Sequence, residues 1–259
     1  GVPITEYISL ALRYSLNLDD VTLDKDTYYS DTDGNGTTEC DPLLAGRYLC
    51  DAIGKRTTSS IGYSLIYDTR NNRIRPTRGQ NVVLSQDFAG LGGDVKYVKT
   101  RLSASKYWPL GAGFIFSLSG EGGYIHSLEG ERRDASGQLV DKVRLTDRFF
   151  LGEPQFRGFD IRGVGPRVKR YYLTAETDAD GNATGKYVRN NSNNNVSDDA
   201  LGGKIYYLAR AEVEIPLGSG AREMGLRPSI FMDAGAVAGL KNPGTINFAG
   251  YCTVTTGTT

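Results

Sequence analysis

The stretch Ile205-Tyr-Tyr-Leu-Ala-Arg-Ala-Glu-Val-Glu-Ile215 carries apolar side chains at its odd positions and mostly polar or charged ones at its even positions. This period of two indicates a β-strand with one apolar and one polar face. Six other segments alternate in the same way, so the sequence predicts seven strands, at about 7–18, 57–68, 80–89, 95–107, 113–126, 203–216 and 226–238. An all-β fold of antiparallel strands is expected.

Two architectures use such strands differently. A soluble sandwich packs its apolar faces together, whereas a membrane barrel turns them to lipid and keeps its polar faces around a water-filled lumen. Three features favour the barrel. Many predicted strands have about ten to thirteen residues, close to the ~9–11 that cross a bilayer at a tilt and longer than the ~5–6 of most strands. Charges occur in mid-strand, and aromatic residues gather near strand ends, as at Tyr7, Tyr107, Trp108 and Tyr124.

The connections between strands mostly alternate in length, as in a barrel with one short-turn side and one long-loop side. Long loops are predicted at 19–56, 128–202 and 239–259, and the short connection at 90–94 departs from the alternation. Seven strands leave two unpaired edges, which lipid does not tolerate, so we expect further strands outside this chain.

One short turn, at 69–79, is basic. Its arginines are Arg70, Arg73, Arg75 and Arg78. From the sequence, a solvated turn is favoured over contact with lipid headgroups.

Composition and charge argue against several function classes. The 259 residues contain 30 basic and 30 acidic side chains without a basic block, which argues against nucleic-acid binding. No apolar run approaches the ~18–20 residues of a membrane helix. The single histidine, His126, and the lack of a recognisable setting for a serine or cysteine nucleophile argue against an enzyme, and no phosphate loop or metal-binding ladder indicates a cofactor.

Two features stand out in the predicted loop 19–56. Cys40 and Cys50 predict a disulfide if the compartment is oxidising, with free thiols as the alternative. Asp31, Asp33 and Asn35 place oxygen ligands at alternate positions, as at the start of a calcium loop. Such a loop would need a bidentate glutamate where this chain has a proline. The incomplete match favours Asx-rich turns over a calcium site.

The longest segment without a strand pattern contains Arg148-Phe-Phe-Leu-Gly-Glu-Pro-Gln-Phe-Arg-Gly-Phe159, followed by Gly163-Val-Gly-Pro166. It resembles the sixth extracellular loop of BamA-type outer-membrane protein assembly factors, of the bacterial surface antigen superfamily. That family has an aliphatic-Arg-Gly-Phe signature here, from which this chain departs mildly by a phenylalanine at the first position. Residues 198–203 and 231–235 resemble the family's twelfth and thirteenth strands, and the upstream strands fit the seventh to eleventh.

The resemblance implies part of a 16-stranded transmembrane barrel whose long extracellular loop folds into the lumen and pairs its arginine with acids on the inner wall. The corresponding motif residues are Phe156, Arg157, Gly158 and Phe159. The alternation of side chains along the strands points independently to two acids as partners of this arginine. Glu212 and Asp233 both lie on the polar, lumen-facing side of their strands. An arginine between two carboxylates makes charge-assisted, partly bidentate hydrogen bonds that lysine matches poorly. We therefore expect a structural latch.

The resemblance also implies a function without covalent chemistry or a cofactor. The family folds β-barrel proteins and inserts them into the outer membrane of Gram-negative bacteria, where client strands pair with a free edge at a weak seam. The implied partners are nascent outer-membrane proteins, the lipid bilayer, and accessory lipoproteins that bind periplasmic domains outside this chain. Two alternatives stay open: a two-partner-secretion translocator of the same superfamily, and a passive porin.

Overall fold

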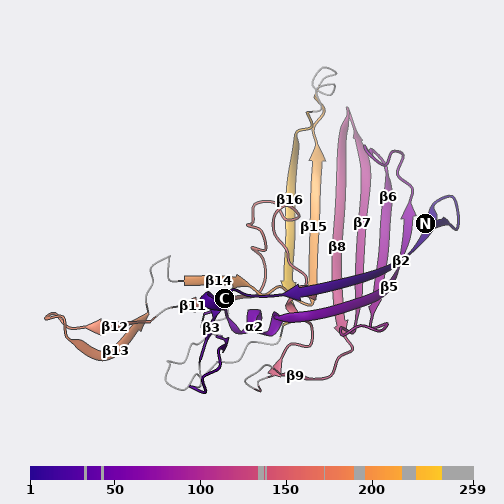
Figure 1. Cartoon of the computed structure of the whole chain (residues 1–259). Helices are drawn as coiled ribbons and strands as arrows, with labels where there is room; N and C mark the ends of the chain where they lie inside the picture. Colours follow the sequence, from indigo (N-terminus) through magenta and orange to yellow (C-terminus); the bar gives the residue numbers. More distant parts are fainter. Residues whose placement is uncertain are drawn as a thin grey trace.

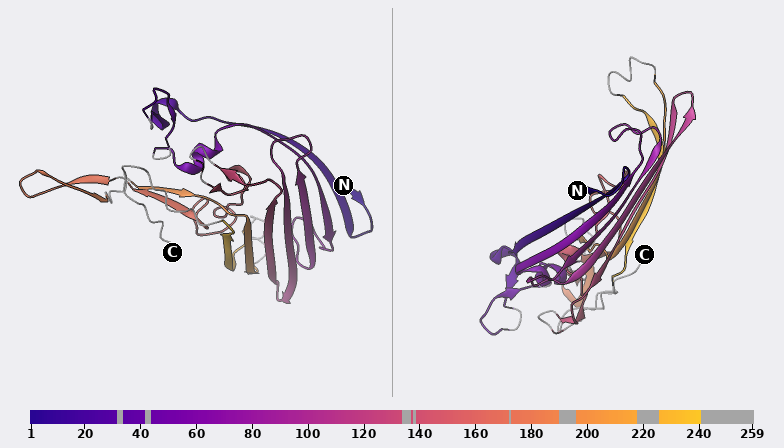
Figure 2. Two further views of the ribbon diagram at one scale, coloured as in Figure 1. Left: turned by 90° about the horizontal axis from the view of Figure 1, so that it is seen from below. Right: turned by 90° about the vertical axis from the view of Figure 1, so that its right-hand side faces the viewer.

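The computed structural model describes residues 1–31, 34–41, 44–133, 137, 139–171, 173–189, 196–217 and 226–240. Within these residues one antiparallel sheet of eight strands dominates (Figure 1), in the order β1-β2-β5-β6-β7-β8-β15-β16. The strands are β1 (Val2–Pro3), β2 (Ile8–Val21), β5 (Gly54–Asp68), β6 (Gly79–Ala89), β7 (Tyr97–Gly111), β8 (Phe114–Ser127), β15 (Ile205–Glu214) and β16 (Ser229–Ala238). Figure 2 shows that the sheet curves as an open wall.

Each of the seven predicted strand ranges overlaps a long strand of this sheet. β2 and β5 extend further toward the long-loop side than alternation indicated, since their pairing runs from Ile8 opposite Tyr67 to Val21 opposite Gly54. Charged residues near these ends interrupt the apolar alternation. The ladder continues because its hydrogen bonds join backbone groups and do not depend on side-chain polarity.

One face of the sheet is apolar and exposed. Leu12 and Leu18 of β2 are 74% and 75% exposed, and Ile230 and Met232 of β16 are 70% and 71% exposed. Soluble proteins rarely expose apolar side chains along whole strands, whereas the outer face of a membrane barrel does so. The polar positions of the same strands form the inner face.

The long-loop side carries the helices and short hairpins, at the lower part of Figure 1. Between β2 and β5 lie α1 (Lys25–Tyr28), β3 (Tyr29–Ser30), β4 (Glu39–Cys40) and α2 (Arg47–Ala52). Between β8 and β15 lie β9 (Arg132–Arg133), β10 (Leu139–Val140), the 3₁₀ turn η1 (Leu145–Asp147), β11 (Arg167–Tyr171), β12 (Leu173–Thr177), β13 (Ala183–Arg189) and β14 (Val196–Ala200). No helix in the described part of the chain is long and apolar enough to span a membrane.

The segment 128–202, predicted as one long loop, therefore contains short paired strands. β9 pairs with β10, β11 with β14, and β12 with β13, all antiparallel. β9 and β10 have only two residues each, and the other strands, of five to seven residues, carry few apolar side chains in alternation, which is why the period of two missed them. The predicted loop 239–259 lies outside the described residues from 241 onward.

Cys40 and Cys50 form a disulfide, with Cα atoms 5.7 Å apart, so the alternative of free thiols is wrong. The bridge fastens α2 to the end of β4. In the calcium-like segment, the Asp31 carboxylate accepts the backbone N–H groups of Asn35 and Gly36 at 3.0 and 2.9 Å. Asn35 Oδ1 accepts the N–H of Thr37 at 2.7 Å, which is the geometry of an Asx turn. Asp33 lies outside the described residues.

Candidate functional site

The segment between η1 and β11 turns back onto the inner face of β15 and β16, beside which it is drawn in Figure 1. An isolated bridge pairs Leu151 with Val164, so the segment forms a narrow loop. Phe156 at its far end is only 4% exposed and packs with Leu208 of β15 and Val237 of β16. Burial of one aromatic side chain against two strands contributes roughly 1.5–3 kcal/mol, which favours the inward path.

The motif forms a tight turn at the end of this loop. The N–H of Phe156 donates to the carbonyl of Gly152 at 2.8 Å. Gly158 has φ of +85°, a left-handed conformation that glycine adopts at little steric cost. The rings of Phe156 and Phe159 lie 4.3 Å apart. The turn thereby presents Arg157 to the wall of the sheet.

Arg157 lies between two carboxylates on neighbouring strands. Its Nε and Nη2 donate to the two carboxylate oxygens of Asp233 at 3.0 and 2.8 Å, and its Nη1 donates to Glu212 at 3.1 Å. The guanidinium also lies over the Phe231 ring, 3.3 Å from its centroid. The structure thus brings together the three charged residues that strand phase and the loop motif had singled out.

The two carboxylates differ in solvent access. The Asp233 side chain is 3% exposed, whereas those of Glu212 and Arg157 are 28% and 29% exposed. The hydrogen bond to Asp233, with a second one to Glu212, raises the pKa of Arg157 above its usual value although burial opposes this. A charge-assisted hydrogen bond contributes roughly 1.5–3 kcal/mol when shielded and less when solvated. Asp233 is therefore the stronger partner.

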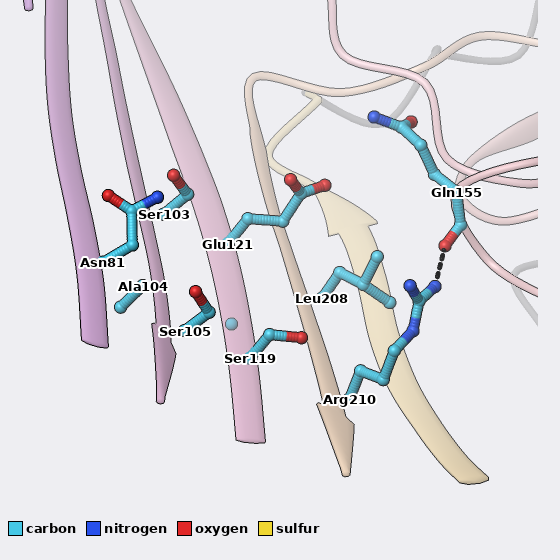
Figure 3. Close-up of a pocket in the computed structure, with 10 residues that line it drawn as sticks. Asn81, Ser103, Ala104, Ser105, Ser119, Glu121, Gln155, Leu208 and Arg210 are labelled. Carbon is cyan, nitrogen blue, oxygen red and sulfur yellow. Dashed lines mark hydrogen bonds between the residues drawn. The ribbon is translucent and has the colours of Figure 1, made fainter. Parts of the chain in front are cut away.

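Arg210 is a further residue of the site that sequence reasoning missed. Its Nε donates to Asp233 at 3.0 Å, and its Nη2 donates to the backbone carbonyl of Gln155 at 2.6 Å, a contact drawn in Figure 3. Asp233 is thus shared by one arginine of the loop and one of the wall. Arg210 could have been identified from the sequence by its position on the polar face of β15, two residues before Glu212.

A second anchor holds the start of the loop. Phe149 packs in a buried cluster with Ile125 and Val143, and its ring lies 4.6 Å from that of Tyr206. Gly123 of β8 permits this contact, because a Cβ there would come within 2.6 Å of both the Phe149 and the Tyr206 rings. Glycine at this position therefore reflects a close approach of two aromatic side chains.

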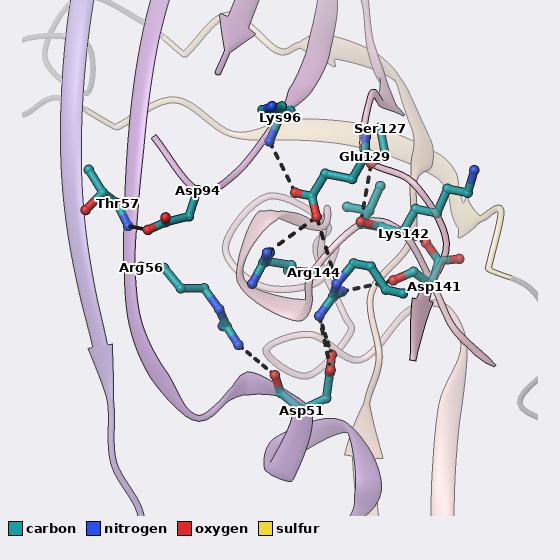
Figure 4. Close-up of polar contacts among 12 residues, drawn as sticks. Asp51, Arg56, Thr57, Asp94, Lys96, Ser127, Glu129, Asp141, Lys142 and Arg144 are labelled. Carbon is teal, nitrogen blue, oxygen red and sulfur yellow. Dashed lines mark hydrogen bonds and ion pairs between the residues drawn. The ribbon is translucent and has the colours of Figure 1, made fainter. Parts of the chain in front are cut away.

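Ion pairs join the loops at the long-loop end of the sheet (Figure 4). Arg132 donates to both carboxylate oxygens of Asp51 at 3.0 Å, and Arg144 donates to Glu129 at 3.4 Å. Asp51 belongs to α2, which the disulfide fastens. The network therefore ties the disulfide-bonded loop to the segment that follows β8.

A polar cavity of about 220 Å³ lies between the loop and the wall of the sheet (Figure 3). Its polar lining residues are Asn81, Ser103, Ser105, Ser119, Glu121, Gln155 and Arg210. Such a lining suits ordered water, in keeping with a wet lumen. Among the described residues, no group of three or more histidine, cysteine, aspartate or glutamate side chains is placed to hold a metal ion.

A comparison with known protein families identifies the family of this chain. The model of the Omp85 superfamily domain matches residues 1–252. The chain belongs to the Omp85 superfamily. The resemblance inferred from the loop motif and the strand order is confirmed.

Curated relatives of this Omp85 chain include assembly proteins. It is 30% identical to the outer membrane protein assembly factor BamA of Neorickettsia risticii (strain Illinois) over 190 residues, which are 73% of this chain and 20% of that protein. It is 32% and 31% identical to the sorting and assembly machinery component 50 homologs of Mus musculus and Homo sapiens over 125 residues, 48% of this chain and 24% of each relative. The chain thus spans about a fifth to a quarter of these relatives.

A solved structure with a similar fold is the crystal structure of BamA from Haemophilus ducreyi lacking POTRA domains 1-3. The TM-score is 0.56 at 19% identity, over 92% of this chain and 40% of that one. The likeness confirms the predicted class, an antiparallel β-barrel segment. The Omp85 chain is part of an outer-membrane barrel of bacterial or mitochondrial type, and it is not an enzyme.

Proposed function

We propose that this chain is the central part of an insertase that folds β-barrel proteins and inserts them into the outer membrane of Gram-negative bacteria. Its clients are nascent outer-membrane proteins, and accessory lipoproteins bind periplasmic domains elsewhere in the protein. The observation that carries the proposal is the contact of Arg157 with Glu212 and Asp233, which fixes a long loop to the inner wall of an Omp85-type sheet.

The extent of the similarity supports a bacterial membrane. The BamA relative aligns over 73% of this chain, and the component 50 homologs align over about half of it. An assembly role also agrees with the names of both kinds of relative.

The latch acts mechanically in this proposal. Arg157 contacts β15 and β16 at once, so it joins the loop to two neighbouring strands and resists their separation. A barrel held in this way at its inner wall can open at a seam elsewhere, where a client strand adds to a free edge through backbone hydrogen bonds. The charged cluster positions the loop, and no bond of the client is made or broken by it.

The test is reconstitution of the full-length protein in liposomes, followed by addition of a urea-denatured β-barrel client. We expect the client to become heat-modifiable and protease-protected faster than in liposomes without the protein. Client folding at the rate of the empty liposomes would contradict the proposal.

The same preparation distinguishes the two other interpretations. A passive porin would give steady ion conductance without accelerating client folding. A secretion translocator would release its cargo on the far side of the membrane instead of inserting it.

A further inference from the structure

The turn between β5 and β6 has an excess of positive charge. Arg70 is neutralised by Asp68 at 2.8 Å. Arg73 approaches the same carboxylate at 3.8 Å, yet its side chain is 85% exposed. Arg75 and Arg78 are also exposed, and no ion pair to either is found within the described structure. One acid therefore faces four arginines.

Side-chain hydrogen bonds order this turn. Asn71 Oδ1 accepts the N–H of Thr77 at 3.1 Å, while Asn72 Oδ1 accepts the N–H groups of Ile74 and Arg75 at 2.8 and 3.0 Å. The apex is Ile74, whose side chain is 88% exposed. The turn thus presents an apolar side chain flanked by two arginines on a preformed backbone, which is unusual for a merely solvated turn.

The neighbouring strands place this turn at a membrane boundary. Gly79, at the end of the turn, pairs with Tyr107 of β7. Trp108, which follows Tyr107 in β7, pairs with Phe116 of β8. The rings of Trp108 and Phe116 stack at 5.4 Å, and the Lys106 Nζ lies 5.2 Å from the centre of the Trp108 ring. Stacked aromatic residues with a basic side chain are typical of the level of the lipid headgroups.

We propose that Arg73, Ile74, Arg75 and Arg78 bind anionic phospholipids on the membrane side opposite the long loops. The arginine forks bind phosphate oxygens, and Ile74 enters the upper acyl region. A lipid is favoured over an acidic protein because the aromatic belt continues directly from the turn and because the exposed isoleucine gains from apolar surroundings. The proposal requires only that the chain spans a bilayer, so it is independent of the insertase function.

The experiment uses the full-length protein in phosphatidylcholine bilayers with traces of spin-labelled phosphatidylglycerol or phosphatidylcholine. Electron paramagnetic resonance measures the fraction of each label that the protein immobilises. We expect the wild type to prefer phosphatidylglycerol roughly twofold or more at low salt, and the preference to weaken in high salt. The variant R73Q/R75Q/R78Q should lose most of it, whereas R73K/R75K/R78K, which keeps the positive charge but lacks the bidentate guanidinium groups, should retain only part of it.

A matched control removes three exposed basic side chains from the long-loop side, in the variant K55Q/K96Q/R133Q. It should keep the preference of the wild type, and a heat-modifiability gel verifies that every variant is folded. The proposal is overturned if R73Q/R75Q/R78Q keeps the wild-type preference. It is also overturned if that variant loses only the binding of a purified accessory subunit, because the turn would then be a protein contact.

Discussion

Asp233 is the point where the loop and the wall of the barrel meet. It accepts hydrogen bonds from Arg157 of the loop and Arg210 of β15, while among the described residues Glu212 accepts from Arg157 alone. Two guanidinium groups thus face two carboxylates, and the cluster is neutral as a whole. Removal of the shielded Asp233 leaves two arginines without their common partner, which costs more than the loss of a solvated surface pair.

The unequal burial of the two acids gives a first prediction. Asp233→Asn should lower the free energy of unfolding by about 2–3 kcal/mol, and Glu212→Gln by about 1 kcal/mol or less. The reason is that the Asp233 side chain is 3% exposed and that of Glu212 is 28% exposed. Urea unfolding of the full-length protein, monitored by the intensity of its heat-modifiable band, measures the loss of stability in both variants. Equal losses would argue against a shielded Asp233.

Arg210 gives a second prediction. Arg210→Gln removes the hydrogen bond to the Gln155 carbonyl and one partner of Asp233, but it leaves Arg157 in place. In a double-mutant cycle, Arg210→Gln and Asp233→Asn should couple by about 1 kcal/mol or more, because they share one interaction. Trypsin cleavage within the loop should also become faster in the single variant. Additive effects on stability would show that Arg210 does not act through Asp233.

At the scale of elements, close packing between β8 and the inward loop gives a third prediction. Gly123→Ala should destabilise the protein by about 1–3 kcal/mol, because its Cβ would overlap the rings of Phe149 and Tyr206. Gly120→Ala on the same strand is the matched control, since its Cβ would meet only a backbone oxygen at 3.8 Å. Thermal unfolding of the two variants should differ clearly. Similar midpoints would contradict the packing of Phe149 against β8.

The disulfide-bonded loop gives a fourth prediction. Replacement of Cys40 and Cys50 by serine should increase hydrogen exchange in α2, because the bridge fastens that helix next to the Arg132–Asp51 ion pair. Exchange in β6 and β7 should stay the same, since their ladder does not involve this loop. Mass spectrometry of the exchanged protein measures both regions. Unchanged protection of α2 would mean that the ion pairs alone hold the helix.

Part of the candidate site and most of the large sheet could be predicted from the sequence. The period of two placed Glu212 and Asp233 on one face, and the motif supplied Arg157, because both signals are local along the chain. The contact of Arg210 with Gln155 depends on the path of a loop 55 residues away in sequence, which no local pattern encodes. The short strands within 128–202 were missed because they have either two residues or little alternation of apolar and polar side chains.

At the scale of the whole molecule, the sheet separates two environments. Its outer face carries exposed leucine, isoleucine and methionine side chains, and its inner face carries the loop, the charged cluster and a polar cavity. The outer face therefore suits lipid and the inner face water, with basic and aromatic residues at the short-turn boundary. Arg157 joins the loop to this inner face, and we expect assembly activity to require the junction.

Charge reversal at Arg157 in the reconstituted full-length protein measures whether assembly activity requires this junction. Arg157→Glu is compared with Arg162→Glu, an exposed arginine of the same loop that lies over Phe150 and forms no ion pair in the described structure. With equal amounts of folded protein in each liposome sample, Arg157→Glu should slow client folding about tenfold or more, the effect of roughly 1.4 kcal/mol. Arg162→Glu should keep the wild-type rate. If Arg157→Glu retained both the wild-type folding rate and its heat-modifiable band, the latch would be contradicted.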